Sequence, residues 1–242
     1  MMTIMPRSRT DFDLRVPASA ADVDGVYATA IGGERVELLA ARALHWPRER
    51  TVFVADVHLG KAASFRAGGI PLPRGGTATD LARLAAVLHQ TGARRLVVLG
   101  DFLHAAAGRV GALDDAYREW RARHAALAIV LVRGNHDDRA GDPPADWGVS
   151  VVAEPHPLAP FLACHLPIAP RSGYALCGHV HPGVTLQGPA DQTERLPCFI
   201  LGRRRAILPA FGTFTGLARA APLAGDRFVA IAGARLFALP PA

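Results

Sequence analysis

Five short apolar runs in this chain each end in or next to carboxylate, amide or imidazole side chains. Such runs, bounded by glycine or polar residues, are typical of buried strands. They are followed, in chain order, by D-V-H, G-D, G-N-H-D, H and G-H-V-H. Strands that end in this way bring their polar residues to one edge of the fold, and this grouping predicts a metal site. The runs occupy residues 52–55, 96–99, 127–132, 161–164 and 174–177.

Helical periodicity predicts two long amphipathic helices, over residues 77–91 and 112–127, and a short helix after residue 59. In the first long helix Leu81, Leu84 and Leu88 form an apolar stripe, Thr77 can cap the start and Gly92 ends it. The second long helix presents Tyr117, Trp120 and Leu127 on its apolar side. Further strands are expected at residues 34–40, 43–46, 51–55, 149–152, 197–201, 205–208, 227–232 and 235–239.

The domain organisation follows from length and pattern. Residues 1–30 carry little hydrophobic pattern, and the rest shows no linker, repeat or low-complexity block. With 242 residues and 50% hydrophobic composition, the chain can bury a full core. We therefore expect a poorly patterned N-terminal segment, 1–30, followed by a single domain over 31–242.

Charge and cysteine content limit the class of protein without identifying it. The net charge is +6 and the pI is about 10.0, which suits a polyanionic partner. However, nearly all the basic residues are arginine, so coding bias explains much of this charge. Three cysteines without a CxxC pair predict neither a disulfide framework nor a structural zinc site. No signal core or long apolar span is found, so a cytoplasmic protein without membrane contact is expected. The oligomeric state is not determined by the sequence.

Candidate metal ligands follow each of the five runs. Asp56 and His58 are two residues apart, and residues i and i+2 at a strand end point to the same side. This pair alone is equally compatible with a polar strand end. Asp101 has two carboxylate oxygens and is suited to bridging two ions. The amide oxygen of Asn135 is a hard ligand. The remaining candidates are His165, His179 and His181, of which the last two repeat the spacing of the first pair.

Other polar residues near these motifs are candidates for catalysis or substrate binding. His136 neighbours Asn135 and can face the reaction without being a ligand, while Asp137 could orient its imidazole. Lys61 and Arg66 could bind a phosphate group, although ordinary solvated cations explain them equally or nearly as well. His104 is interpreted as lying behind the ligands or facing the substrate. Arg171, in the loop between His165 and His179, is a further substrate-facing candidate.

The donor set predicts the chemistry. Two Asp, one Asn and several His, without Cys, suit Mn, Fe or Zn. So many ligands exceed the needs of one ion and favour two ions roughly 3.5–4 Å apart. Such a centre generates hydroxide from water near neutral pH and neutralises phosphate oxygens, so that phosphorus can be attacked. The imidazole of His136 can then protonate the departing alkoxide.

The ordered motifs D-x-H, G-D-x-x-H, G-N-H-D, H and G-H-x-H, from Asp56 to His181, resemble the calcineurin-like metallophosphoesterase superfamily. The resemblance implies an α/β fold, a four-layer αββα sandwich in which two mixed β-sheets are flanked by helices on both outer sides. It implies that Asp101 bridges two divalent metals and that His136 is the proton donor. At His104 many members have an acidic residue or Asn. The implied first-metal ligands are Asp56, His58, Asp101 and His181, and Asn135, His165 and His179 complete the second site.

A narrower resemblance concerns residues 55–66, 99–104, 176–182 and 208–216, which are similar to the bacterial ligase-associated DNA-damage-response phosphoesterases. It implies a manganese-dependent phosphodiesterase or endonuclease that acts on DNA beside a repair ligase and a helicase. The basic pI agrees with DNA as substrate.

Two alternatives remain open. One is a phosphatase or phosphodiesterase for small nucleotides, because the chain lacks a long tract of basic residues interleaved with aromatics. The other is a non-catalytic scaffold of a DNA repair complex. The full ligand set argues against the scaffold, because unused buried ligands are costly to desolvate.

Overall fold

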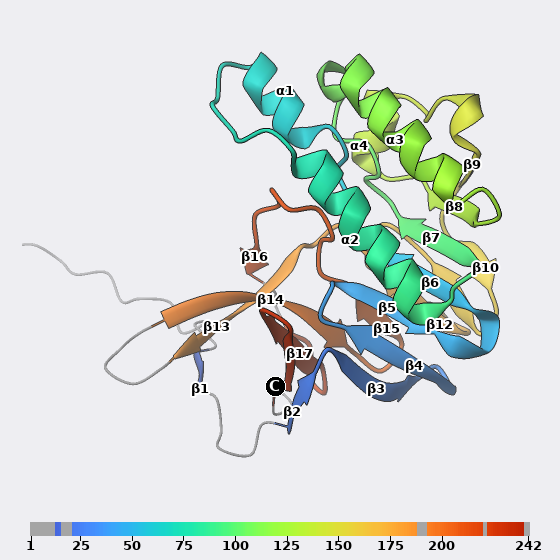
Figure 1. Ribbon diagram of the computed structural model, residues 1–242. Coiled ribbons are helices and arrows are strands. Elements are labelled where there is room, and N and C mark those ends of the chain that lie inside the picture. Colours follow the sequence, from blue (N-terminus) through green and yellow to red (C-terminus); the bar gives the residue numbers. More distant parts are fainter. Residues whose placement is uncertain (1–12, 16–20, 188–192, 220–221, 240–242) are drawn as a thin grey trace, which may run out of the picture.

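The computed structural model describes residues 13–15, 21–187, 193–219 and 222–239, which form two mixed β-sheets packed face to face (Figure 1). The predicted two-sheet sandwich is thereby confirmed. All five apolar runs that precede the polar motifs are strands, because each alternates side chains between two buried surfaces.

The first sheet contains seven strands of the described chain, in the order β3-β4-β5-β6-β7-β8-β9. Neighbours from β3 to β6 are antiparallel, whereas β6 to β9 are parallel. Because parallel strands end at the same edge, the segments after β6, β7 and β8 lie together. The strands are β3 (Val26–Ile31), β4 (Glu34–Leu39), β5 (Ala43–Trp46), β6 (Thr51–Val54), β7 (Arg95–Leu99), β8 (Ala128–Val132) and β9 (Val149–Val152).

The second sheet contains eleven strands of the described chain, with the main order β10-β11-β12-β15-β14-β17-β18-β2. β13 pairs with β14 and also carries β1 and β16 beside it. The strands are β1 (Asp13–Arg15), β2 (Ala21–Asp24), β10 (His156–Leu158), β11 (Phe161–Ala163), β12 (Tyr174–Cys177), β13 (Pro182–Gln187), β14 (Thr193–Leu201), β15 (Arg205–Ile207), β16 (Ala218–Arg219), β17 (Arg227–Ala232) and β18 (Arg235–Ala238).

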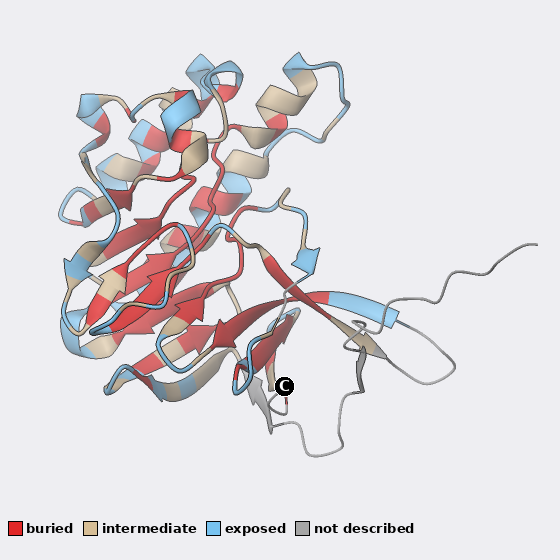
Figure 2. Ribbon diagram, turned by 180° about the vertical axis from the view of Figure 1, so that it is seen from behind, coloured by how far each residue is buried: buried red, intermediate tan, exposed pale blue. Residues whose placement is uncertain are grey.

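Alternate side chains of the central strands build two separate cores. In β6, Phe53 points into the core between the two sheets, whereas Val52 and Val54 face the helices. In β7, Val97 and Val98 divide in the same way. Burial on both faces explains why these strands read as continuous apolar runs. Figure 2 shows the buried residues concentrated in the strands and the exposed ones on the helices and outer loops.

The described helices pack on the first sheet. α2 and α3 contribute Leu84, Tyr117 and Trp120 to the core on that side. Figure 1 shows every labelled helix on this side of the molecule, so the second helical layer of the expected four is not found among the described residues. The helices are α1 (Lys61–Ala67), α2 (Gly76–Thr91), α3 (Gly111–Arg123) and α4 (Asn135–Ala140), with single 3₁₀ turns η1 (Pro47–Glu49), η2 (Ala106–Gly108) and η3 (Ala145–Trp147).

Helix ends differ from the sequence expectations in two places. Gly75, with a left-handed φ of 97°, precedes α2, and no side chain caps this helix, so Thr77 lies inside the helix and is not its cap. Gly92 ends α2 in the left-handed conformation, as expected. α3 ends at Arg123, four residues before Leu127, because the imidazole of His124 turns back to the carbonyl of Trp120 at 2.7 Å.

The segment before residue 31 contributes strands to both sheets. β3 (Val26–Ile31) pairs with β4, and β2 pairs with β18. These strands were not expected, because β3 lies at a sheet edge and is only partly buried, which leaves no clear hydrophobic pattern. Residues 1–12 and 16–20, the rest of the poorly patterned segment, lie outside the described residues. No helix of the described chain is long and apolar enough to span a membrane.

Candidate metal centre

The segments that follow β6, β7, β8, β11 and β12 meet at one edge of the sandwich. Their polar residues adopt an uncommon backbone conformation. Left-handed φ values are rare for residues with a side chain, and Asp, Asn and His tolerate them best. Clusters of such residues are typical of functional sites. Within the described chain, five of the seven non-glycine residues with positive φ are ligand candidates: Asp56 (53°), His58 (52°), Asp101 (52°), His179 (69°) and His181 (51°).

A first cluster contains Asp56, His58 and His181, which each offer one ligand atom within 4.8 Å of the others. The Nε2 atoms of His58 and His181 lie 3.4 Å apart, and Nε2 of His181 lies 3.6 Å from Oδ1 of Asp56. Both Asp56 and His58 are buried. Burial, and then the positive charges of Lys61 and neighbouring histidines, lower the pKa of His58 well below its usual range. Its imidazole is therefore neutral and able to donate a lone pair.

A second cluster contains Asp101, His165 and His179, again within 4.8 Å of one another. Nε2 of His165 lies 2.9 Å from Oδ1 of Asn135 and 3.1 Å from Nδ1 of His179. On the opposite side of its ring, Nδ1 of His165 lies 3.1 Å from the carbonyl oxygen of Leu99, to which it can donate. That hydrogen bond leaves a lone pair on Nε2, directed at the other donors.

Asp101 lies between the two clusters. Its Oδ2 is 3.9 Å from Nε2 of His58, and its Oδ1 is 3.5 Å from Nε2 of His165. Oδ1 also accepts a hydrogen bond from the backbone N–H of His136 at 2.9 Å. The carboxylate thus presents one oxygen to each cluster, which is the arrangement that a bridging ligand requires.

These residues fit divalent cations. The side-chain oxygens of Asn135 and Asp101 and Nδ1 of His179 all lie within 3.5 Å of Nε2 of His165. When His165 donates from Nδ1 to Leu99, its Nε2 carries a lone pair that faces and repels the lone pairs of the two oxygens. A cation at each cluster replaces this repulsion with coordination by carboxylate, amide and imidazole donors.

The two i, i+2 pairs behave differently. Asp56 and His58 meet in one cluster, as the strand-end argument predicts. His179 and His181 separate, because His181 joins Asp56 whereas His179 joins His165. The strand-end argument therefore fails for the second pair, and extended alternation does not explain the first pair either, since all four residues have left-handed φ values. The division between clusters is the one that the family resemblance implied.

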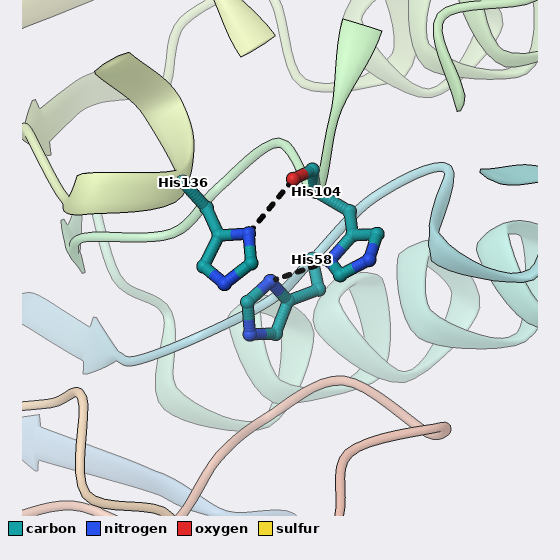
Figure 3. A group of neighbouring side chains, drawn as sticks. All are labelled: His58, His104 and His136. Carbon is teal, nitrogen blue, oxygen red and sulfur yellow. Dashed lines mark hydrogen bonds between the residues drawn. The ribbon is translucent and has the colours of Figure 1, made fainter. Parts of the chain in front are cut away.

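His136 forms a third group with His58 and His104, whose ligand atoms lie within 4.8 Å of one another, and Figure 3 shows the three rings close together. Its Nδ1 lies 2.9 Å from the carbonyl oxygen of His104 and can donate to it. The ring of His136 stacks on that of His104, with centroids 4.9 Å apart. No hydrogen bond from Nε2 of His136 is found within the described part of the chain, so this nitrogen can exchange a proton with a ligand.

His104 contacts two candidate residues at once. Its carbonyl accepts from His136, while its Nδ1 lies 3.4 Å from Nδ1 of His58. Phe65 stacks on the other side of the His104 ring, at 5.8 Å and 14°. Burial, followed by the charges of Lys61 and His136, lowers the pKa of His104 to about 4. His104 is therefore neutral near pH 7, and the contacts with His58 and His136 are compatible with either of its two sequence interpretations.

Asp137 does not orient the imidazole of His136, and that expectation is corrected. Its two carboxylate oxygens accept hydrogen bonds from the backbone N–H groups of Leu103 and Gly134, both at 2.9 Å. The side chain is fully buried at the start of α4, and burial raises its pKa to about 6. Asp137 thus fixes the turn that carries Asn135 and His136.

The three cationic candidates lie at different distances from the centre. Lys61 begins α1, and the carboxylates of Asp56 and Asp101 act on its charge, although burial is the larger effect and lowers its pKa. Arg66 instead donates to the carbonyls of Leu72 (3.4 Å) and Pro73 (3.1 Å), so it holds the loop after α1.

Arg171 is exposed, and its carbonyl accepts from the guanidinium of Arg204. The described residues show no contact between Arg171 and the ligand candidates. Its expected position facing the substrate is therefore not supported, because the loop that carries it reaches the opposite end of β12, where the N–H of Ala175 donates to the carbonyl of Arg204.

Two features of the site were missed in the sequence. Gly100 and Gly134 are packed so closely that a Cβ at either position would collide, with the ring of His165 and with Asp101 respectively. The loop of residues 211–216 lies against the first cluster, with the N–H of Gly212 donating to the carbonyl of Asp56 at 3.1 Å. The glycines in these motifs indicate that the backbone is closely packed there. The residues that they contact are distant in sequence, so those partners could not be predicted.

The chain is similar to known proteins in sequence and in structure. A family model described as calcineurin-like phosphoesterase matches residues 49–181. The crystal structure of Pseudomonas putida nuclease MPE is 40% identical, with a TM-score of 0.75, and the match covers 88% of this chain and 100% of that one. The structure of YfcE, a phosphoesterase from E. coli, is 16% identical, with a TM-score of 0.37, over 76% of this chain and 88% of that one. No curated protein sequence matches significantly.

Proposed function

The chain belongs to the calcineurin-like phosphoesterase family and is a metal-dependent phosphoesterase. From that premise we propose that it is a dinuclear, manganese-dependent nuclease that hydrolyses phosphodiester bonds in DNA. The observation that carries the proposal is the position of Asp101, with one oxygen towards each ligand cluster. That arrangement suits in-line displacement at phosphorus.

Different residues of the chain contribute to metal binding and to phosphate binding during hydrolysis. Asp56, His58 and His181 would hold one cation, Asn135, His165 and His179 would hold the other, and Asp101 would contribute to both sites. When bound, the cations lower the pKa of a water molecule and neutralise phosphate oxygens. Lys61, close to both carboxylates, adds positive charge where a phosphate binds.

His136 supplies the proton for the leaving group. Its Nδ1–H remains on the carbonyl of His104, which fixes the ring and directs Nε2 outwards. A protonated Nε2 can then donate to the departing oxygen as the bond to phosphorus breaks. No covalent bond between chain and substrate is needed, since the attacking oxygen comes from water.

Two facts support a nucleic acid as the substrate, and among nucleic acids we propose DNA. The relative that aligns over its full length, at 40% identity, is described as a nuclease. The chain also carries a net charge of +6, which attracts a polyanion. The resemblance of residues 55–66 to ligase-associated phosphoesterases further leads us to propose a role in cytoplasmic DNA repair beside a ligase and a helicase.

A substrate panel tests this proposal. Purified protein with Mn²⁺ is offered single-stranded DNA, duplex DNA, nicked duplex, a cyclic dinucleotide and a phosphomonoester, with Asp101→Ala as the inactive control. The proposal expects cleavage of at least one DNA substrate, at a kcat/KM higher than for the cyclic dinucleotide or the monoester. Activity on the monoester or the cyclic dinucleotide without DNA cleavage would contradict it.

A further inference from the structure

The loop of residues 211–216 is attached to the backbone that carries the first ligand pair. The N–H of Phe211 donates to the carbonyl of Ala55 at 2.7 Å, and that of Gly212 donates to the carbonyl of Asp56 at 3.1 Å. The backbones are so close that a Cβ on Gly212 would collide with the carbonyl of Val57. The loop therefore keeps a fixed position relative to Asp56 and His58.

A buried carboxylate of α2 holds the same loop from the other side. Asp80 accepts hydrogen bonds from the hydroxyl and the backbone N–H of Thr213, and from Nη2 of Arg83 at 2.9 Å. Arg83 in turn donates to the carbonyl of Phe211. Burial raises the pKa of Asp80, while Thr213 and Arg83 oppose that effect. The loop is thus held rigidly between α2 and the ligand segment.

The two phenylalanines of this loop have different environments. Phe211 is fully buried, with the guanidinium of Arg83 over its ring at 4.3 Å. Phe214 is only partly buried, and among the described residues no aromatic ring or guanidinium covers it. One edge of its ring packs on Gly76, where a Cβ would lie 2.6 Å from Cε2. Its faces are therefore not used by another ring of the described chain.

Phe214 also shares a pocket with the metal centre. The pocket is lined by residues of the first cluster's segment, of α1, of the α2 N-terminus and of the loop, among them His58, Lys61, Thr77, Thr213, Phe214 and Thr215. The pocket has room for about one water molecule and is also lined by Asp80, so a nucleotide would lie across its mouth, beside the cation of Lys61. A phenyl ring cannot donate or accept a conventional hydrogen bond, so it requires an apolar or aromatic ligand group.

We propose that Phe214 is a stacking surface for a nucleobase of the strand whose phosphate lies at the metal centre. This inference rests on the proposed nuclease function and adds a residue that contributes to its specificity. Base–aromatic stacking accepts every base, because each has a π-face. The rigid attachment through Asp80 and Gly212 positions the ring before the substrate arrives, which reduces the entropy lost on binding.

Oligonucleotides with and without bases test the proposal in the presence of Mn²⁺. The substrates are a single-stranded dT oligomer and an oligomer of the same length in which every nucleotide is an abasic analogue. For Phe214→Ala we expect kcat/KM to fall about 5- to 100-fold on the dT oligomer and less than about twofold on the abasic one. Phe214→Trp should keep the wild-type preference, whereas Phe214→Leu, which retains apolar bulk, should behave like Phe214→Ala.

A second pair of variants tests the position of the Phe214 ring without changing the ring itself. Gly76→Ala places a methyl group against Phe214, whereas Gly111→Ala changes the matching first position of α3, where no atom lies within 4 Å. Gly76→Ala should lower kcat/KM on the dT oligomer alone, and Gly111→Ala should leave both rates unchanged.

The outcomes separate this inference from the function on which it rests. Equal losses on both oligomers in Phe214→Ala, with wild-type activity intact, would overturn the stacking role and leave the nuclease function standing. A wild-type protein that cleaves neither oligomer nor any other DNA would overturn both. Thermal unfolding of each variant within a few degrees of wild type shows that the loop has not simply unfolded.

Discussion

The Nδ1 atom of His136 lies 2.9 Å from the backbone carbonyl oxygen of His104, and the two imidazole rings stack at 4.9 Å. This contact holds a non-ligand imidazole beside two ligand clusters by means of a main-chain atom. Because every residue has a carbonyl group, substitution at position 104 keeps the hydrogen bond and removes only the ring. The contributions of the two histidines can therefore be separated.

His136→Ala should retain metal binding and lose rate. The imidazole belongs to neither of the two clusters that Asp101 joins, although it forms a third group with His58 and His104, and it is the group that can protonate the leaving oxygen. We expect kcat to fall about 10²- to 10⁴-fold with an alkyl leaving group and much less with p-nitrophenolate, which leaves without a proton. Kinetics with both leaving groups, together with metal analysis, check this. Loss of metal in the variant would contradict the role.

His104→Ala should lower kcat by about tenfold, because it removes the ring between Phe65 and His136, whereas His104→Phe should restore most of the rate. With a pKa of about 4, His104 is neutral near pH 7. The ratio of variant to wild-type rate should thus stay constant between about pH 6 and pH 8. A Phe variant as slow as the Ala variant would show that the ring nitrogens, and not the stack, matter.

Gly100→Ala should disable the second cluster. A Cβ at Gly100 would collide with the ring of His165, and φ there is +76°. Gly33→Ala is the matched control, since φ is +80° and no atom lies within 4 Å. Both variants should lose about 1–3 kcal/mol of stability through backbone strain. Only Gly100→Ala should bind one metal fewer, as measured by metal analysis. Unchanged metal content would contradict the packing argument.

Asp80→Asn should destabilise the loop of residues 211–216. The substitution weakens the contacts with Thr213 and leaves the largely buried guanidinium of Arg83 without its countercharge. We expect the free energy of unfolding to fall by about 1–3 kcal/mol in a denaturant titration. Asp146→Asn, which breaks the exposed pair with Arg118, serves as control and should change stability little. Equal effects would contradict the account of the loop.

The central strands and the polar residues after them could be predicted from the sequence, because strands buried on both faces read as apolar runs. The edge strand β3 could not, since it is only partly buried. The division of His179 and His181 between clusters depends on left-handed backbone that apolar periodicity does not reveal. The position of Asp137 depends on the turn into α4, and the contact of Asp80 with Thr213 joins residues 133 positions apart.

Metal stoichiometry tests most directly the claim that two ligand clusters meet at Asp101. Protein stripped with EDTA and reloaded with Mn²⁺ should bind two ions per chain. His181→Ala should retain one ion, His165→Ala should also retain one, and Asp101→Ala should bind both weakly and lose nuclease activity. A single ion in the wild type, or two tightly bound ions in Asp101→Ala, would contradict the claim.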